Sequence, residues 1–211
     1  MKNPIKILII MLLFSVTLFS QGFIVKASGE QTFSFFDKVG RNQASFFSTA
    51  PIENITGISN DITGSVTFKV EDLTTLRGTV SISTASLKTG IELRDTHLRS
   101  PAWLDAERYP QISFTIKKVR DIISSGHNKL NASVTGDFTV HGVTKEIIAT
   151  VSMGYLDGSE ITRKRAPGDL LSVEAKFNIT LSDFEIENIV LGQKVSDKIE
   201  ITAALVGSNA Q

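Results

Sequence analysis

The chain has 211 residues, 22 basic against 22 acidic side chains, no cysteine, and 41% hydrophobic residues. All-β barrels and sandwiches of about 200 residues form single domains, so one domain is expected. The lack of cysteine excludes disulfides, a thiol nucleophile and a thiolate metal site, and the zero net charge gives no electrostatic footprint for nucleic acid. Thirteen Phe residues against one Trp and two Tyr indicate an apolar interior with few polar groups.

Residues 1–27 are typical of a secretory signal peptide. Two lysines precede an apolar run, Ile7–Phe19, that has the length of an h-region. Val25 and Ala27 supply the small residues that precede a cut, so we expect cleavage after Ala27, a mature domain over residues 28–211, and a periplasmic or secreted location. The alternative is an uncleaved membrane anchor, which the polar residues in and after the run disfavour, because a spanning helix needs about 20 apolar residues.

Beyond Ala27, apolar and polar residues alternate, which indicates β-strands with one buried face. A less regular strand precedes the clearest runs, and together they make about eight strands. The predicted strands lie at 44–48, 62–70, 76–82, 112–116, 130–140, 147–155, 171–179 and 199–205.

The segments between these strands predict antiparallel connections. His141-Gly142 separates two alternating runs by two residues, which signals a tight turn. Residues 121–129 and 156–169 are polar and predict loops. Residues 93–106 lack alternation and predict a short helical excursion. No gap suits a series of parallel crossovers, so the fold class is all-β, either a closed antiparallel barrel or a two-sheet sandwich.

Nearly every inward-facing row contains a small residue among its large ones. An eight-stranded barrel is just wide enough to be filled by side chains or to hold one small ligand, so these residues indicate a lumen. The other interpretation is that the glycines bend the sheet and the alanines only adjust the packing. The small residues are Gly64, Gly78, Ala132, Gly136, Ala149, Ala175 and Ala203.

Five blocks of sequence resemble the YceI-like family, and they occur in the family's order. They are residues 86–90 (SLKTG), 94–100 (RDTHLRS), 104–106 (LDA), 109–114 (YPQISF) and 136–145 (GDFTVHGVTK). The resemblance covers about Phe33 to Val206, and it implies an eight-stranded antiparallel, lipocalin-like barrel, usually exported, that binds a polyisoprenoid or a similar long-chain amphiphile. Many members have an Arg before and a Gly after the Asp183-Phe184 pair, where this chain has Ser182 and Glu185.

We therefore expect an exported carrier or sequestering protein for an isoprenoid-like lipid, such as a polyisoprenoid or an isoprenoid quinone, with no cofactor. Burying one methylene group contributes about 0.8 kcal/mol, so a chain of about twenty carbons can be held mainly by apolar contact. The inward residues expected to line the lumen are Phe68, Val80, Phe114, Val134, Gly136, Phe138, Ala149, Val151, Ala175 and Phe177.

The densest polar cluster lies in the helical excursion. An enzyme acting on a bound lipid would use Asp95 to orient His97 as a general base, but residues two apart on a helix do not face each other. Asp95 and Arg99, four apart, can pair and fix the excursion across a barrel end. We therefore expect no catalytic residues, and we expect Arg94, His97 and Trp103 to frame the mouth of the lumen.

Two further interpretations concern a metal ion and a membrane as partners. The three histidines have no metal-binding spacing, so no metal site is expected. Arg163-Lys164-Arg165 is a basic loop cluster, either solvated surface or a site of transient contact with an anionic membrane.

Besides the carrier and the lipid-modifying enzyme, a third possible function is a secreted structural or interaction domain with a filled core. The sequence determines neither the oligomeric state nor which barrel end is open.

Overall fold

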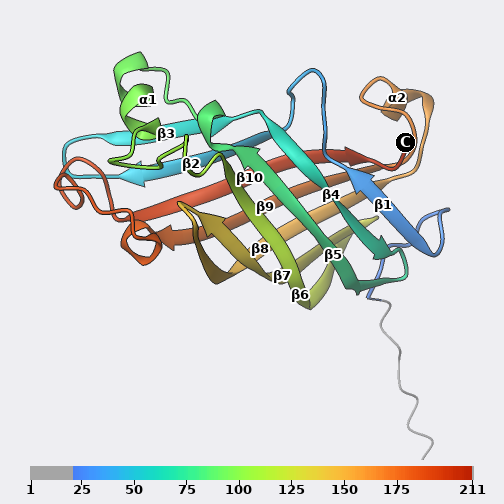
Figure 1. Ribbon diagram of the computed structural model, residues 1–211. Helices are drawn as coiled ribbons and strands as arrows, with labels where there is room; N and C mark the ends of the chain where they lie inside the picture. The colour runs from blue at the N-terminus through green and yellow to red at the C-terminus, as the bar shows by residue number, and fades with distance from the viewer. Residues whose placement is uncertain (1–20, 211) are drawn as a thin grey trace, which may run out of the picture.

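The computed structural model describes residues 21–210, which form a closed antiparallel β-barrel with short helices (Figure 1). The first 20 residues of the expected signal peptide lie outside this range. The strands are β1 (Glu30–Ser34), β2 (Gln43–Thr49), β3 (Asn54–Ser59), β4 (Ile62–Lys69), β5 (Asp72–Ser83), β6 (Gln111–Gly126), β7 (Lys129–Val140), β8 (Val143–Leu156), β9 (Leu170–Thr180) and β10 (Lys198–Ser208). The helices are α1 (Glu92–Arg99) and α2 (Glu160–Arg163), with 3-10 turns η1 (Thr84–Ser86) and η2 (Leu181–Phe184).

Eight strands close on themselves. Their order is β1-β4-β5-β6-β7-β8-β9-β10, each pairing is antiparallel, and β1 returns to β10 where Ser34 pairs with Ser208. On the same edge, residues Ile199–Ala204 of β10 pair with β2. Strands β2 and β3 form a hairpin, and β3 is its outer strand. The predicted eight-stranded antiparallel barrel is confirmed.

The free edge of β3 is covered by the segment that follows η1. The N–H of Ile58 donates to the carbonyl of Lys88 at 2.9 Å, and the N–H of Lys88 donates to the carbonyl of Ile58 at 3.0 Å. The hydroxyls of Ser59 and Ser86 lie 2.6 Å apart and strengthen the same junction. Residues 86–90, one of the family-like blocks, therefore help to close the wall beside α1.

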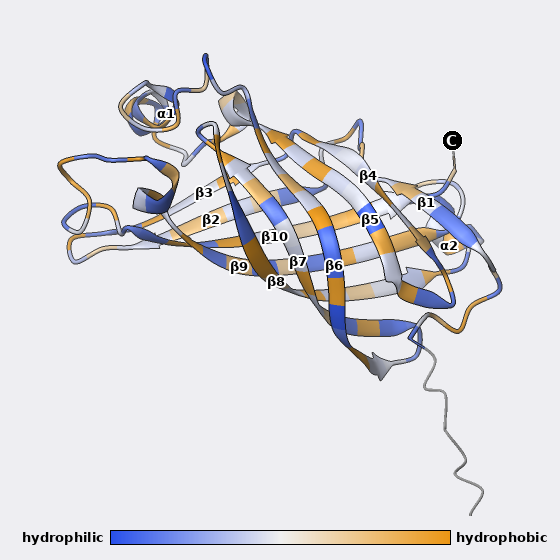
Figure 2. Ribbon diagram, turned by 60° about the horizontal axis from the view of Figure 1, so that its bottom comes forward, coloured by the Kyte–Doolittle hydropathy of each residue, from blue (hydrophilic) through white to orange (hydrophobic). Residues whose placement is uncertain are grey.

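All the predicted strands are present, and alternating hydropathy is visible along β6 and β7 (Figure 2). The sequence fails to predict β1, which buries a single residue, and β3, whose inward positions include a glycine and a serine, so neither alternates clearly. The predicted loop at 121–129 is also wrong over 121–126, because β6 continues to Gly126 through three register shifts. Such irregularities break the period-two pattern without ending the strand.

The predicted tight turn and helical excursion are both present. His141 and Gly142 have φ angles of 53° and 76°, as a two-residue type I′ turn requires. Helix α1 begins one residue before the predicted excursion at 93–106 and lies against one end of the barrel, whereas α2 lies near the other (Figure 1).

Two of the small inward residues shape the sheet instead of widening the lumen. Gly64 and Gly78 have φ angles of 109° and 144°, which side chains with a Cβ rarely adopt. A Cβ at Gly64 would collide with the backbone of Thr79, and one at Gly78 would collide with that of Ser65. Here the interpretation that glycine coils the sheet holds.

Candidate ligand-binding cavity

The barrel encloses a cavity of about 830 Å³ that reaches the surface beneath α1. Its walls are the inward faces of β4 to β10, together with β2 and β3, because alternate residues of each strand point into a barrel. The exposed residues Ile91 and Leu93 at the start of α1 also line it and mark the opening, which we call the mouth. The volume lies high in the range of about 300–1,000 Å³ typical of small-molecule sites.

A row of three alanines crosses three neighbouring strands of the cavity wall. Ala175 of β9 pairs with Ala203 of β10, and Ala203 pairs in turn with Ala44 of β2. On its other side Ala175 pairs with Val151 of β8. All four residues line the cavity. Since alanine fills much less of a barrel interior than the large side chains around it, this alignment leaves space inside the wall.

Aromatic side chains form another part of the wall. The ring of Phe177 lies 5.7 Å from that of Phe114 and 5.2 Å from that of Phe138, measured between centroids, and all three line the cavity. Phe138 also packs edge-on against Phe184 at 5.6 Å, nearer the mouth. These rings offer a long apolar surface with no hydroxyl group.

Most of the predicted lumen residues line the cavity, and two do not. Phe68 is fully buried at the opposite barrel end, where its ring stacks on Phe33 at 5.7 Å. Gly136 lies beneath the Phe114 ring, with which an added Cβ would collide, so its small size admits that ring and not a ligand. The residues that do line the cavity are Val80, Phe114, Val134, Phe138, Ala149, Val151, Ala175 and Phe177. Their contact with a ligand stays a prediction.

The end opposite the mouth, which we call the closed end, is packed solid. Phe33, Phe68 and Tyr155 have exposed fractions of 0%, 0% and 2%, and the rings of Phe33 and Tyr155 meet edge-on at 5.4 Å. The Tyr155 hydroxyl donates to Asp169 at 2.7 Å. Burial and this carboxylate raise the pKa of Tyr155 far above its ordinary value, so the hydroxyl stays a neutral donor.

A polar network holds α1 over the mouth. Arg94 Nη1 lies 3.2 Å from Glu53 Oε2 in the β2–β3 turn, and Arg94 Nε donates to the Thr89 hydroxyl at 2.9 Å. The N–H and the hydroxyl of Thr89 each donate to Asp95 Oδ1 at 2.6 Å. Burial alone would raise the pKa of Asp95, but these hydrogen bonds hold it below its ordinary value. These contacts tie α1 to the β2–β3 turn and to the segment between η1 and α1.

The predicted pairing of Asp95 with Arg99 is replaced by other contacts. Arg99 donates to the Leu87 carbonyl at 3.4 Å. Asp95 accepts hydrogen bonds from Thr89, because the chain before α1 folds back under the helix. His97 is exposed and lines the mouth together with half-buried Trp103. With its carboxylate directed at Thr89, Asp95 does not form the pair with His97 that an acid–base mechanism would use.

Sequence reasoning misses the loop between η2 and β10, which forms one side of the mouth. Ile186, Val190 and Val195 of this loop line the cavity, and the Asn188 side chain donates to the Ala102 carbonyl at 3.2 Å. The loop has no strand or helix periodicity, so only its content of aliphatic residues between polar ones could have marked it.

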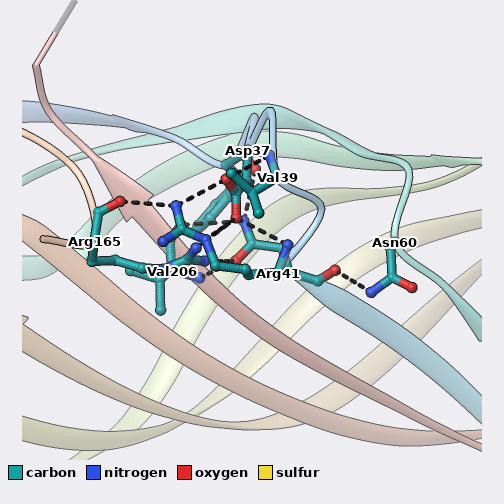
Figure 3. Close-up of polar contacts among 8 residues, drawn as sticks. Asp37, Val39, Arg41, Asn60, Arg165 and Val206 are labelled. Atoms are coloured by element: carbon teal, nitrogen blue, oxygen red, sulfur yellow. Dashed lines mark hydrogen bonds and ion pairs between the residues drawn. The ribbon is translucent and has the colours of Figure 1, made fainter.

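The predicted basic cluster is partly structural, as Figure 3 shows. Arg165 forms an ion pair with Asp37 and donates to the Asn42 side chain at 2.8 Å. Hydrogen bonds from Arg41, and then from Arg165, outweigh burial and hold the pKa of Asp37 well below its usual range. Asn42 is 2% exposed and links the carbonyl of Phe35 to the backbone of Val206. This network, which we call the seam network, connects the segment after β1 to β10, close to the point where the pairing of these two strands ends.

Residues 21–210 hold neither a cluster of metal ligands nor a membrane-spanning helix. No group of three or more His, Cys, Asp or Glu side chains in this part of the chain is arranged to hold a metal ion. Among the same residues, no helix has the length and apolar character needed to cross a membrane.

The closed antiparallel wall and the apolar interior that opens beneath α1 define a cavity-bearing β-barrel. The YceI-like domain matches residues 36–206, and the chain belongs to the YceI-like family. A UPF0312 protein of Vibrio campbellii is 38% identical over 132 residues, 63% of this chain and 65% of that protein. Protein YceI of Escherichia coli O157:H7 is 32% identical over 131 residues, 62% of this chain and 63% of its own length. The matches to curated relatives thus span about half to two thirds of their length.

Solved structures share the fold at low sequence identity. BcnA of Burkholderia cenocepacia superposes with a TM-score of 0.63 at 20% identity, covering 80% of this chain and 98% of that one. The YceI protein of Campylobacter jejuni gives 0.62 at 23% identity, covering 77% and 89%. A polyisoprenoid binding domain from Saccharophagus degradans gives 0.60 at 14% identity, covering 87% and 100%.

Proposed function

We propose that this protein carries or sequesters a long apolar lipid of the polyisoprenoid or isoprenoid-quinone class inside its barrel, in the periplasm or outside the cell. The observation that carries the proposal is the cavity of about 830 Å³ with its aliphatic and aromatic walls. The likeness to the polyisoprenoid binding domain of Saccharophagus degradans supports the ligand class. The signal-peptide pattern of the first 27 residues supports export.

Apolar contact alone is sufficient to hold such a ligand. About twenty buried carbons at about 0.8 kcal/mol each contribute about 16 kcal/mol, against an association cost of about 4–15 kcal/mol. Among the described residues that line the cavity, the charged ones, Glu53, Arg94 and Lys194, belong to the mouth. A polar headgroup would therefore stay at the mouth while the chain enters the barrel.

The two alternative functions have less support. A domain with a filled core would not leave a cavity of this size between Ala44, Ala175 and Ala203. An enzyme using Asp95 and His97 would need the two side chains to meet, whereas Asp95 accepts its hydrogen bonds from Thr89. Carriage needs only the apolar cavity and an entrance.

In the proposed function, the mouth is the part of the barrel that meets a membrane. Ile91 and Leu93 are 52% and 67% exposed beside the entrance, so a lipid could pass from a bilayer into the cavity along apolar surface. The basic residues 163–165 lie near the other end of the barrel (Figure 1), and Arg165 is already paired with Asp37. Residues 163–165 are therefore less suited to contact with a membrane than the residues at the mouth are.

A pair of neighbouring substitutions tests the cavity as the binding site. Ala203 lines the cavity, whereas Ala204 is exposed on the outer face of the same strand. With vesicles containing an isoprenoid quinone, Ala203→Phe is expected to lower uptake at least about tenfold, while Ala204→Phe leaves it unchanged. Leu93→Asp, which places a charge beside the entrance, should slow uptake. Native mass spectrometry of the protein from its own host should show bound lipid. Uptake by Ala203→Phe equal to that of the unmodified protein would contradict the proposal.

A further inference from the structure

The residues just before β1 are built into the barrel wall. Gln21 forms a parallel β-bridge with Asp72, and the Gln21 carbonyl accepts from the N–H of Leu73 at 2.9 Å. The N–H of Phe23 donates to the Val70 carbonyl at 2.8 Å. Gly22, between them, passes so close to the turn joining β4 and β5 that an added Cβ would collide with its backbone. The segment therefore pairs with the barrel as a strand does.

Its side chains close the barrel end opposite the mouth. Phe23 is 5% exposed, and its ring lies 5.8 Å from that of Phe68 and 5.6 Å from that of Tyr155. Val25 packs against the same cluster, while the intervening Ile24 is 79% exposed, so inward and outward positions alternate.

The segment also crosses to the other side of that end. The N–H of Lys26 donates to Asp157 in the loop after β8 at 3.1 Å, and Ala27 packs on the same apolar cluster. Gln21–Ala27 thus runs from the β4–β5 turn to the β8–β9 loop. We call Gln21–Ala27 the end plug.

We infer that the end plug is part of the working protein and that any removal of the N-terminal leader stops before Gln21. A cut after Ala27, as the sequence pattern predicts, would remove Phe23 and its backbone bonds and uncover Phe68 and Tyr155. Ser20 supplies a small residue immediately before Gln21, as the position next to a cut requires. With the plug kept, the cavity has one entrance. The position of the cut rests on the proposed export, whereas the closure of the barrel does not.

The first test is the mass of the exported protein. The full chain is expressed in its own host, and the N-terminus of the purified protein is read by intact-mass measurement and N-terminal sequencing. The inference expects a first residue at Gln21 or before it, and an uncut chain also keeps the plug. A chain that begins at Gly22 or later would overturn the inference. Neither result depends on whether lipid is bound.

The second test compares two adjacent residues in the same full chain. Phe23→Ala is expected to lower the melting temperature by about 6–20 °C, because a buried ring is lost from a domain of this size. Ile24→Ala should change it by no more than about 1 °C. If both variants melt like the unmodified protein, the plug is not part of the fold. Phe23→Leu, expected to give a smaller drop, keeps the test informative should Phe23→Ala not fold, and the mass of each variant is checked.

Discussion

The two ends of the barrel are made from the same alternating strands, yet one is solid and the other hollow. At the closed end, Phe33 and Phe68 are fully buried with ring centroids 5.7 Å apart. In the cavity, Phe114 and Phe177 have the same 5.7 Å separation but are only half-buried, because one side of each faces open space. Alternation therefore decides which residues point inward, and the size of the residues opposite them decides whether the interior is filled.

The largest expected effect comes from removing one ring at each end. Phe33→Ala should lower the free energy of unfolding by about 3–5 kcal/mol, since it creates a cavity in packed surroundings. Phe177→Ala should cost about 1–2 kcal/mol, because it enlarges a space that already exists. Urea unfolding measures both values. Equal losses from the two variants would mean that the two ends do not differ in packing.

A smaller effect separates the seam network from the rest of the surface. Asp37→Asn should lower the free energy of unfolding by about 1–3 kcal/mol at pH 7, because Arg41 and Arg165 lose a charged partner. Folding lowers the pKa of Asp37 below its unfolded value of about 3.9, so this stabilisation is complete above that pH and is lost as the pH falls. The difference in free energy of unfolding between Asp37→Asn and the unmodified protein should therefore be smaller at about pH 3 than at pH 7.

The control for this effect is Asp137→Asn. Asp137 pairs with Lys117 on the exposed barrel wall, and surface pairs contribute about 0–1 kcal/mol. A gap between Asp37→Asn and the unmodified protein that stays constant from neutral to acid pH would show that the charge of Asp37 is not what stabilises the seam.

The smallest effect concerns the loop that enters the mouth. Glu185 follows η2 with φ of 57°, a left-handed conformation that suits glycine better than a residue with a Cβ. Glu185→Gly should raise the free energy of unfolding by about 0.5–1 kcal/mol. Asp183→Gly, at a position without positive φ, should lower it by a similar amount. Thermal melts compare them, and a destabilised Glu185→Gly would show that the Glu185 side chain makes a contribution beyond its backbone conformation.

Parts of the candidate site follow from local pattern. Ala175 and Phe177 lie on the inward face of one strand, and both line the cavity as the alternation predicts. Phe68 has the same pattern but lies at the closed end, because its depth along the barrel axis depends on how β4 is staggered against its neighbours. The partner of Asp95 could not be predicted either, since Thr89 reaches it only after the preceding segment has docked on β3.

The sequence by itself determined the class of fold, the inward faces of most strands and the tight turn at His141. These are properties of single strands and turns, and they depend on residues close together in the chain. Only the tertiary structure decided that Ala44, Ala175 and Ala203 stand in one row, that the mouth lies under α1, and that the other end is closed. Register and closure arise from pairing between strands far apart in sequence. That pairing decides which large and small residues face each other, and so leaves the lumen open at one end of the barrel and filled at the other.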